Sequence, residues 1–242
     1  MKKVCILNVA TNHYIQFINP LLDSIDVNFL NGHTVDALVF TNQELEVESD
    51  RIKVSQIQHE PWPMPTLKRY HYFLQEEEHI QKYDYCFYLD VDMLIADTVG
   101  EEIFGDLVAT QHPGMWAGTP DSFTYERRPQ STAYVPYGTG IKYYAGGFNG
   151  GKPTNFLGMA ETIVENINRD FDSGIIAEWH DESHMNRYFI DNPPTLELTP
   201  SYCFPEGADE NGAPTKYYPY GWKVPFPPKI MALQKNHNEV RQ

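Results

Sequence analysis

Short apolar runs alternate with polar turns along the first third of the chain. Residues 3–9, 35–40 and 51–57 have the length and apolar content of strands, and the last of them alternates as a half-buried strand does. Between the first two, apolar positions in residues 14–25 fall on one helical stripe, which Pro20 should kink or restart. Strand, helix and strand in this order predict a βαβ unit within a mainly parallel sheet.

A fourth strand is predicted at residues 85–89, where an aromatic, apolar run ends abruptly at Asp90 and Asp92. The helix before it is expected to begin at Thr66, a capping residue that follows the proline-rich, non-helical segment 61–65. In an open α/β sheet, ligands bind beyond the carboxyl ends of the strands. The two carboxylates are therefore placed where a ligand is expected.

The second half of the chain predicts further strands and helices without a repeat or a linker. In order, we expect strands at 105–110, 133–136 and 143–151, helices at 156–167 and 179–190, and an ordered surface loop rich in Pro, Gly and Tyr at 205–228. These elements predict one α/β domain with a mainly parallel central sheet and flanking helices.

The spacing of Asp90 and Asp92 points to a cation. If the strand stays extended to its end, both side chains lie on the same side, because strand side chains alternate with period two. Two converging carboxylates suit Mg²⁺ or Mn²⁺ that shares its remaining positions with a phosphate. The alternative is that the two acids stand on a solvated turn by chance.

Composition narrows the classes of partner. The net charge is −15, with 33 acidic and 18 basic side chains, so nucleic acid and anionic lipid should be repelled, whereas a nucleotide held by a metal is compatible. The three cysteines lack the spacing of a zinc site and are expected to be buried thiols. No run approaches ~20 apolar residues and no signal peptide is recognisable, so a soluble, cytoplasmic protein without a membrane anchor is expected.

Two further segments contain candidate chemistry. The glycines of Gly146-Gly147 and Gly150-Gly151 match neither a dinucleotide fingerprint nor a P-loop, so they predict either a close approach to the backbone or a β-bulge packed on a helix. His180 and His184 are one helical turn apart, which leaves a metal-dependent hydrolase as an alternative. A non-catalytic glycan-binding module is a further alternative, although it would need neither the acidic pair nor Glu182.

Taken together, these segments resemble glycosyltransferase family 6, the retaining enzymes that include the blood-group A and B transferases. The resemblance runs from about Val9 to Arg241 and is strongest at residues 123–133, 143–151, 179–186 and 235–241. It implies a single GT-A domain with a Rossmann-like sheet, comprising a nucleotide-binding part (1–92), an acceptor and donor-sugar part (93–234) and a tail that closes over UDP (235–242). It also implies transfer of a sugar, with retention, from a UDP-sugar to the 3-hydroxyl of a galactoside in an oligosaccharide acceptor.

The resemblance assigns roles to individual residues. Glu182 matches the candidate nucleophile beneath the anomeric carbon, and Asp90 and Asp92 match a metal-binding pair that holds Mn²⁺, or Mg²⁺ in its place. The residues assigned to the sugar donor are Val9, Ala10, Thr11, Tyr14, Arg69, Asp90, Val91, Asp92, Ala145, Gly146, Gly147, Asp181, Lys235, His237 and Arg241. Those assigned to the acceptor are His112, Thr124, Trp179 and Glu182.

The resemblance also indicates substrate preferences. Small residues at 145–147 leave room for an acetamido group, so UDP-GalNAc is expected over UDP-Gal, with Fucα1-2Gal as the acceptor. Vertebrate members carry an anchor and a stem that this sequence lacks, so it resembles a bacterial or phage member. Many bacterial members have Asn-x-Asn at the metal position, whereas this chain keeps the two acids, which predicts metal dependence. An acidic acceptor contact of the vertebrate enzymes is replaced by Pro205, followed by Glu206 and an inserted loop.

Overall fold

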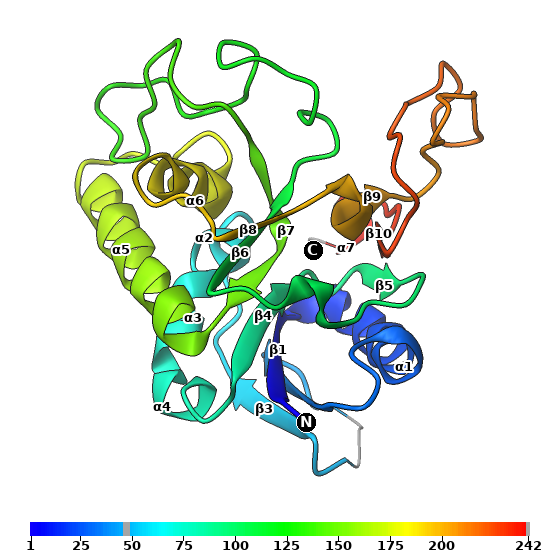
Figure 1. The fold of residues 1–242 in the computed structure, drawn as a ribbon. Helices are drawn as coiled ribbons and strands as arrows, with labels where there is room; N and C mark the ends of the chain where they lie inside the picture. The colour runs from blue at the N-terminus through cyan, green and yellow to red at the C-terminus, as the bar shows by residue number, and fades with distance from the viewer. Residues whose placement is uncertain (46–48, 241–242) are drawn as a thin grey trace.

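A seven-stranded sheet forms the centre of the structure, a computed structural model that describes residues 1–45 and 49–240 (Figure 1). The strand order is β3-β2-β1-β4-β7-β6-β8. The strands are β1 (Lys3–Val9), β2 (Thr34–Thr41), β3 (Ile52–Gln56), β4 (Tyr85–Leu89), β6 (Leu107–Gln111), β7 (Tyr144–Gly151) and β8 (Leu196–Leu198). Neighbours pair in parallel except at β7, which is antiparallel to both β4 and β6. The predicted α/β class with a mainly parallel sheet is confirmed.

Helices cover both faces of this sheet. They are η1 (Asn12–Phe17), α1 (Ile18–Asn28), α2 (Met64–Leu67), α3 (Arg69–Gln75), α4 (Glu77–Ile80), η2 (Glu101–Ile103), α5 (Pro153–Asp172), α6 (His180–Asp191), η3 (Pro200–Cys203) and α7 (His237–Val240). Helix α1 lies on one side of the sheet, and α3 and α5 lie on the other (Figure 1).

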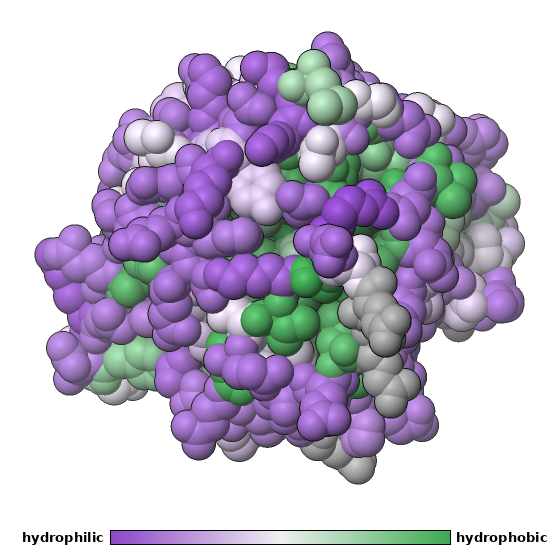
Figure 2. Space-filling model, turned by 90° about the horizontal axis from the view of Figure 1, so that it is seen from below, coloured by the Kyte–Doolittle hydropathy of each residue, from purple (hydrophilic) through white to green (hydrophobic). Residues whose placement is uncertain are grey.

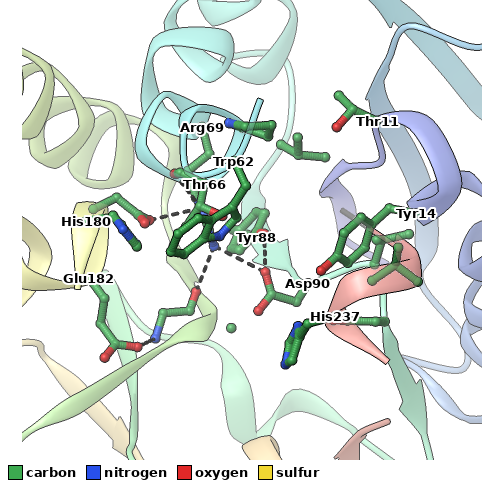
Figure 3. Close-up of a pocket in the computed structure, with 18 of the residues that line it drawn as sticks. Thr11, Tyr14, Trp62, Thr66, Arg69, Tyr88, Asp90, His180, Glu182 and His237 are labelled. Carbon is green, nitrogen blue, oxygen red and sulfur yellow. Dashed lines mark hydrogen bonds and ion pairs between the residues drawn. The ribbon is translucent and has the colours of Figure 1, made fainter. Parts of the chain in front are cut away.

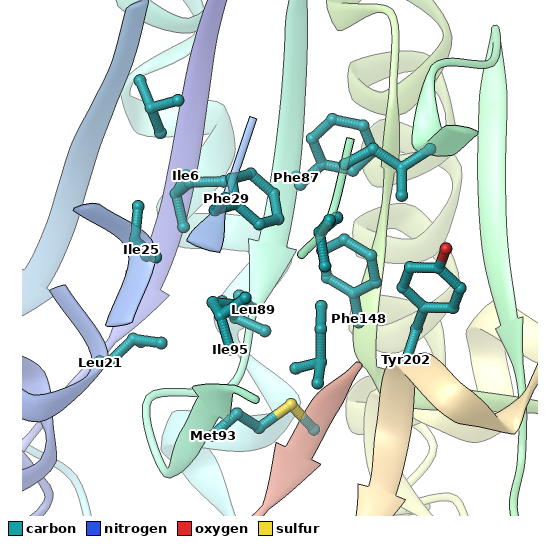
Figure 4. Close-up of a cluster of buried hydrophobic side chains, with 14 of the residues drawn as sticks. Ile6, Leu21, Ile25, Phe29, Phe87, Leu89, Met93, Ile95, Phe148 and Tyr202 are labelled. Carbon is teal, nitrogen blue, oxygen red and sulfur yellow. The ribbon is translucent and has the colours of Figure 1, made fainter. Parts of the chain in front are cut away.

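The two faces of the sheet explain why β1 and β4 are apolar throughout. Along β1, Val4 and Ile6 pack into the core beneath α1, whereas Cys5 and Leu7 pack into the core beneath α3 and α5. Alternate residues of a strand point to opposite faces, so a strand covered on both sides is apolar at every position. In the core beneath α1, Phe87 from β4 stacks on Phe148 from β7, with ring centroids 5.6 Å apart (Figure 4).

A second, three-stranded sheet joins the middle of the chain to its end. Strand β10 (Ile230–Ala232) pairs antiparallel with β5 (Met93–Ile95) and parallel with β9 (Phe204–Pro205). Directly after β10, the Leu233 N–H donates to the Asp92 carbonyl over 2.9 Å. The C-terminal segment is thereby fixed next to the acidic pair. These strands are only two or three residues long, and we did not predict them because periodicity is too weak over such lengths.

Two helix starts differ from the prediction. The break in the first helix comes before Ile18, so Pro20 stands in the first turn of α1, where a missing N–H leaves no hydrogen bond unmade. Thr66 is not a cap, because α2 already begins at Met64. Pro65, expected to be non-helical, stands at the second position of α2, because the first turn of a helix tolerates proline.

The strand predicted at 133–136 is wrong. This segment is a loop in which the Val135 N–H donates to the Glu126 carbonyl over 2.9 Å and the Ala133 N–H donates to Ser131 Oγ over 3.0 Å. A hydroxyl next to the backbone offers the local hydrogen bonds that a strand partner would otherwise supply.

The face seen from below in Figure 2 is mostly hydrophilic, with smaller hydrophobic areas between the polar side chains. Among the helices of residues 1–45 and 49–240, none has the length and apolar content needed to cross a membrane.

Candidate active site

A cleft of roughly 300 Å³ lies beyond the carboxyl ends of β1 and β4. The predicted site residues that line it are Val9, Thr11, Tyr14, Arg69, Asp90, Val91, Asp92, Gly146, Gly147, Trp179, Asp181, Glu182, Lys235 and His237. They come from six separate stretches of the chain, and Figure 3 shows Tyr14 and His237 across the cleft from His180 and Glu182. The sheet-end position predicted for the ligand is therefore where the cleft lies.

Four predicted residues do not line the cleft. Ala10 and Ala145 are buried in the core at 0% and 2% exposure. His112 and Thr124 do not line the cleft itself. Arg241 is outside the residues that the structure describes.

Arg69 is the central cation of the cleft. Its Nη1 lies 3.2 Å from Asp90 Oδ1, and its guanidinium lies over the Tyr88 ring at 4.4 Å from the centroid. The Tyr88 hydroxyl donates to the same Asp90 oxygen. Arg69 Nε forms a second ion pair with Asp181 Oδ2 at 2.9 Å. The two ion pairs and the Tyr88 ring together hold the guanidinium in one orientation.

Asp181 is buried at the start of α6 with only 1% of its surface exposed. Burial raises the pKa of Asp181 to about 7, with Glu182 and Asp90 adding to the rise and Arg69 opposing it. Within the described part of the chain, Asp181 Oδ1 has no hydrogen-bond partner. A buried polar atom that lines a cleft without a partner is a candidate contact for a ligand hydroxyl.

Asp90 directly follows β4, and Asp92 lies within the turn that comes next. The extended geometry expected for them is wrong, because the chain turns at Val91 and Asp92 directly after β4. The Asp90 N–H still donates to the Gly147 carbonyl over 2.9 Å, and Asp92 forms an ion pair with Lys235. Burial raises the pKa of Asp92, Asp90 adds to the rise, and Lys235 opposes it.

The pair fits a divalent ion that takes most of its ligands from substrate. Asp90 and Asp92 both line the cleft, and no group of three or more His, Cys, Asp or Glu side chains suited to a metal occurs in residues 1–45 and 49–240. Mg²⁺ and similar ions are commonly held by one or two carboxylates together with substrate phosphates and water. A complete protein cage is therefore not required for these two residues to hold Mn²⁺ or Mg²⁺.

Glu182 is fixed by two hydrogen-bond donors. The Tyr143 hydroxyl donates to Oε1 over 2.8 Å, and the Gly146 N–H donates to Oε2 over 2.7 Å. A Cβ atom on Gly146 would lie 3.3 Å from Oε2, so a glycine there lets the carboxylate approach the backbone. Tyr143 was not predicted as a site residue, although it directly precedes the glycine-rich strand.

The glycine-rich strand is both a bulge and a lining of the cleft. Pairing between β6 and β7 passes from Ala109 opposite Asn149 to Thr110 opposite Ala145, so residues 146–148 of β7 leave the ladder with β6. Gly146 and Gly147 in this stretch line the cleft. Both alternatives left open by the sequence, a β-bulge and a close approach to the backbone, are therefore found in this strand.

The predicted acceptor residues gather around Tyr143. The centroid of the His112 ring lies 5.7 Å from that of the Tyr143 ring, and Thr124 is close enough to the Tyr143 hydroxyl to oppose the rise in its pKa that burial causes. Trp179, 47% exposed, lines both the main cleft and a shallower groove that includes Thr124. His112 and Thr124 therefore lie next to Tyr143, the residue that holds Glu182.

His180 and His184 do not form a shared metal site. His180 lines the cleft, whereas His184 is buried at 2% exposure with its Nε2 3.8 Å from Asp170 Oδ2. Burial lowers the pKa of His184 to about 4, against the opposing effect of Asp170. With the two imidazoles in different surroundings, the geometry gives the hydrolase alternative no support.

Comparison with known proteins agrees with this geometry. The profile of glycosyltransferase family 6 matches residues 2–242. The chain belongs to glycosyltransferase family 6. It is therefore a glycosyltransferase, and membership implies a nucleotide-sugar donor and a glycan acceptor.

Relatives within family 6 include mammalian, avian and bacterial proteins. The chain is 32% identical to rat histo-blood group ABO system transferase 2 over 96% of its own length and 69% of that protein. It is 29% identical to chicken globoside alpha-1,3-N-acetylgalactosaminyltransferase 1, over 96% and 67% of the two chains. It is 30% identical to the O-antigen biosynthesis glycosyltransferase WbnI of Escherichia coli, over 85% and 89%.

Proposed function

We propose that the protein is a retaining α-1,3-glycosyltransferase that moves GalNAc, and Gal less readily, from a UDP-sugar to the 3-hydroxyl of a galactoside, with Fucα1-2Gal as the acceptor. The observation that carries the proposal is the position of Glu182, held by Tyr143 and Gly146 in the cleft that also contains Asp90 and Arg69. The chicken relative is named as an alpha-1,3-N-acetylgalactosaminyltransferase, which supports both the α-1,3 linkage and GalNAc as the transferred sugar.

The diphosphate is proposed to bind between the acidic pair and the cations of the cleft. Asp90 and Asp92 would hold Mn²⁺ or Mg²⁺, which when bound neutralises charge on the departing diphosphate. Arg69 and Lys235, already paired with these two acids, offer charge-assisted hydrogen bonds to phosphate oxygens.

The nucleotide and the tail are proposed to lie on the side of the cleft that includes Tyr14 and His237. Val9, Thr11 and Tyr14 of the nucleotide-binding part face the cleft together with His237 of the tail. We propose that the uridine lies against the first three residues and that residues 235–242 close over the diphosphate. All three parts of the chain (1–92, 93–234 and 235–242) would then contribute to one catalytic domain.

Glu182 is proposed to act beneath the anomeric carbon. The bond from that carbon to the phosphate oxygen breaks and its electron pair leaves with UDP, while the acceptor 3-hydroxyl forms the new bond and its proton ends on the leaving group. Retention requires two inversions through a covalent ester of Glu182, or same-face attack on an ion pair that Glu182 stabilises. Asp181, through its unpartnered Oδ1, would bind a hydroxyl of the transferred sugar.

The acceptor is proposed to lie on the other side of Glu182. His112 and Thr124 lie next to Tyr143, the partner of Glu182, and Trp179 lines a groove together with Thr124. An exposed indole beside a polar groove suits the apolar face and hydroxyls of a sugar.

An activity screen tests the proposal. UDP-GalNAc and UDP-Gal are each incubated with galactosides with and without the α1-2 fucose, in Mn²⁺ or in EDTA. We expect α-linked product, faster with UDP-GalNAc and the fucosylated acceptor, and loss of activity in EDTA that Mn²⁺ restores. UDP binding without transfer to any acceptor would favour the glycan-binding alternative, and full activity in EDTA would refute metal dependence.

A further inference from the structure

The loop between β9 and β10, residues 206–229, is attached to the segment that leads into the tail. The Gln234 N–H donates to Glu206 Oε2 over 2.8 Å, and the Gln234 side-chain amide donates to the Tyr218 hydroxyl over 2.7 Å. Gln234 directly precedes Lys235, the partner of Asp92. One side of the loop is therefore fixed next to the proposed diphosphate site.

The other side of the loop meets the acceptor side. A Cβ atom on Gly114 would lie 3.6 Å from Cζ2 of Trp222, so the indole of Trp222 packs against the backbone there. The Gly114 N–H donates to His112 Nδ1 over 3.0 Å, and the rings of Trp116 and Phe226 meet edge-to-face at 5.4 Å. Two pairs of residues thus join the loop to the segment that contains His112.

Trp222 is held in one place by its own loop. Its ring meets that of Tyr218 edge-to-face at 4.9 Å, and Tyr218 is itself bonded to Gln234. The Trp222 carbonyl accepts from the Asp209 N–H over 3.2 Å, and the Asp209 carbonyl accepts from the Val224 N–H over 3.2 Å. A side chain that is already ordered loses little conformational entropy when it binds a ligand.

A short series of contacts links Trp222 to the proposed catalytic carboxylate. Trp222 lies against Gly114, and the Gly114 N–H is bonded to His112. The His112 ring lies against Tyr143, and the Tyr143 hydroxyl is bonded to Glu182. In this series of contacts, Trp222 comes after the predicted acceptor residue His112 and is further from Glu182. An oligosaccharide acceptor that extends from the reacting sugar past His112 would next meet Trp222.

From this arrangement we infer that Trp222 is an acceptor-specificity residue, whose ring contacts the sugar unit next to the reacting galactoside. The inference rests on the proposed function. The ligand it fits is a neutral oligosaccharide, because the indole offers an apolar face to sugar C–H groups and a protein of net charge −15 disfavours an acidic glycan. A monosaccharide galactoside would not reach the indole.

Kinetics with acceptors of two lengths test this assignment. For Trp222→Ala we expect the KM of a neutral trisaccharide acceptor to rise about tenfold, while the KM of a methyl galactoside and the KM of the UDP-sugar stay within about twofold. Trp222→Phe should retain most of the affinity for the trisaccharide. Tyr220→Ala is the matched control, because the Tyr220 ring is in the same loop and is 98% exposed.

The outcomes separate the two proposals. If the unmodified protein transfers sugar but Trp222→Ala has an unchanged trisaccharide KM, the role of Trp222 is refuted and the proposed function stands. If the KM values of both acceptors and the UDP-sugar rise together, Trp222 is only structural and the inference is also overturned. If the unmodified protein transfers to no acceptor, the proposed function fails and the inference fails with it.

Discussion

The two glycine pairs of β7 have the same composition but different neighbours. At the sheet end of the strand, a Cβ on Gly150 would lie 2.3 Å from the Cys86 carbonyl oxygen, and Gly151 has a φ of +138°. At the cleft end, a Cβ on Gly146 would meet the Glu182 side chain, and a Cβ on Gly147 would lie 2.4 Å from Cε of Met93. Backbone atoms leave no room for a Cβ at the sheet end of β7, whereas side-chain atoms occupy that room at the cleft end.

Because of this difference, we expect substitutions at one end of β7 to affect stability and substitutions at the other end to affect the cleft. Backbone atoms of a paired strand cannot move without breaking the ladder, so a side chain at Gly150 should cost stability. The side chains of Glu182 and Met93 can shift without breaking the ladder, so a side chain at Gly146 or Gly147 should instead change the shape of the cleft. Helix α6 is divided in the same way, with Glu182 in the cleft and His184 in the core.

The largest effect is expected for Glu182→Gln. The amide keeps the size of the side chain and removes the charge that stabilises the anomeric centre, so transfer should fall by about 10³-fold or more while UDP affinity and melting temperature hardly change. Rates are measured with UDP-GalNAc and the fucosylated acceptor, and UDP binding by calorimetry. Glu161→Gln, an exposed position on α5, is the control and should leave the rate unchanged. Transfer at the normal rate in Glu182→Gln would refute the mechanism.

The comparison also indicates what the sequence could and could not predict. Periodicity placed the main strands and put Asp90 at the end of β4, because these features depend on neighbouring residues. Tyr143 was missed because its partner Glu182 is 39 residues away, and no local pattern encodes such a contact. The turn at Asp92 was missed because the short strand β5 that follows it depends on pairing with β10.

Ala145 differs from the two glycines that follow it in where it lies. It belongs to the same short stretch as Gly146 and Gly147, yet it is buried in the core while the two glycines line the cleft. Residues 146–148 leave the ladder with β6, and this irregularity separates Gly146 and Gly147, which line the cleft, from Ala145. A bulge depends on both strands, so the sequence of one strand does not locate it.

An intermediate effect, on stability alone, is expected for Gly150→Ala. The new methyl group would also lie 2.7 Å from Cα of Phe87, so β4 and β7 must separate, at a cost of about 3 kcal/mol in the free energy of unfolding. Urea unfolding measures this free energy. Gly158→Ala is the matched control, since nothing lies within 4 Å of its Cβ position in α5 and alanine favours a helix by about 1 kcal/mol. Equal stability of the two variants would contradict the distinction between the ends of β7.

The smallest effect, on the choice of sugar donor, is expected for Gly147→Ala. Its methyl group would lie 3.0 Å from Asp90 Oδ2 as well as against Met93, so it narrows the cleft beside the acidic pair without meeting backbone. We expect a stable protein in which the ratio of kcat/KM for UDP-GalNAc to that for UDP-Gal falls about tenfold, the usual effect of one methyl group in a binding pocket. Adding Met93→Ala removes the atom that the methyl group meets, so recovery of the ratio in the double variant would assign the effect to crowding through Met93. An unchanged ratio together with lost stability would instead show that the cleft end of β7 is as rigid as the sheet end.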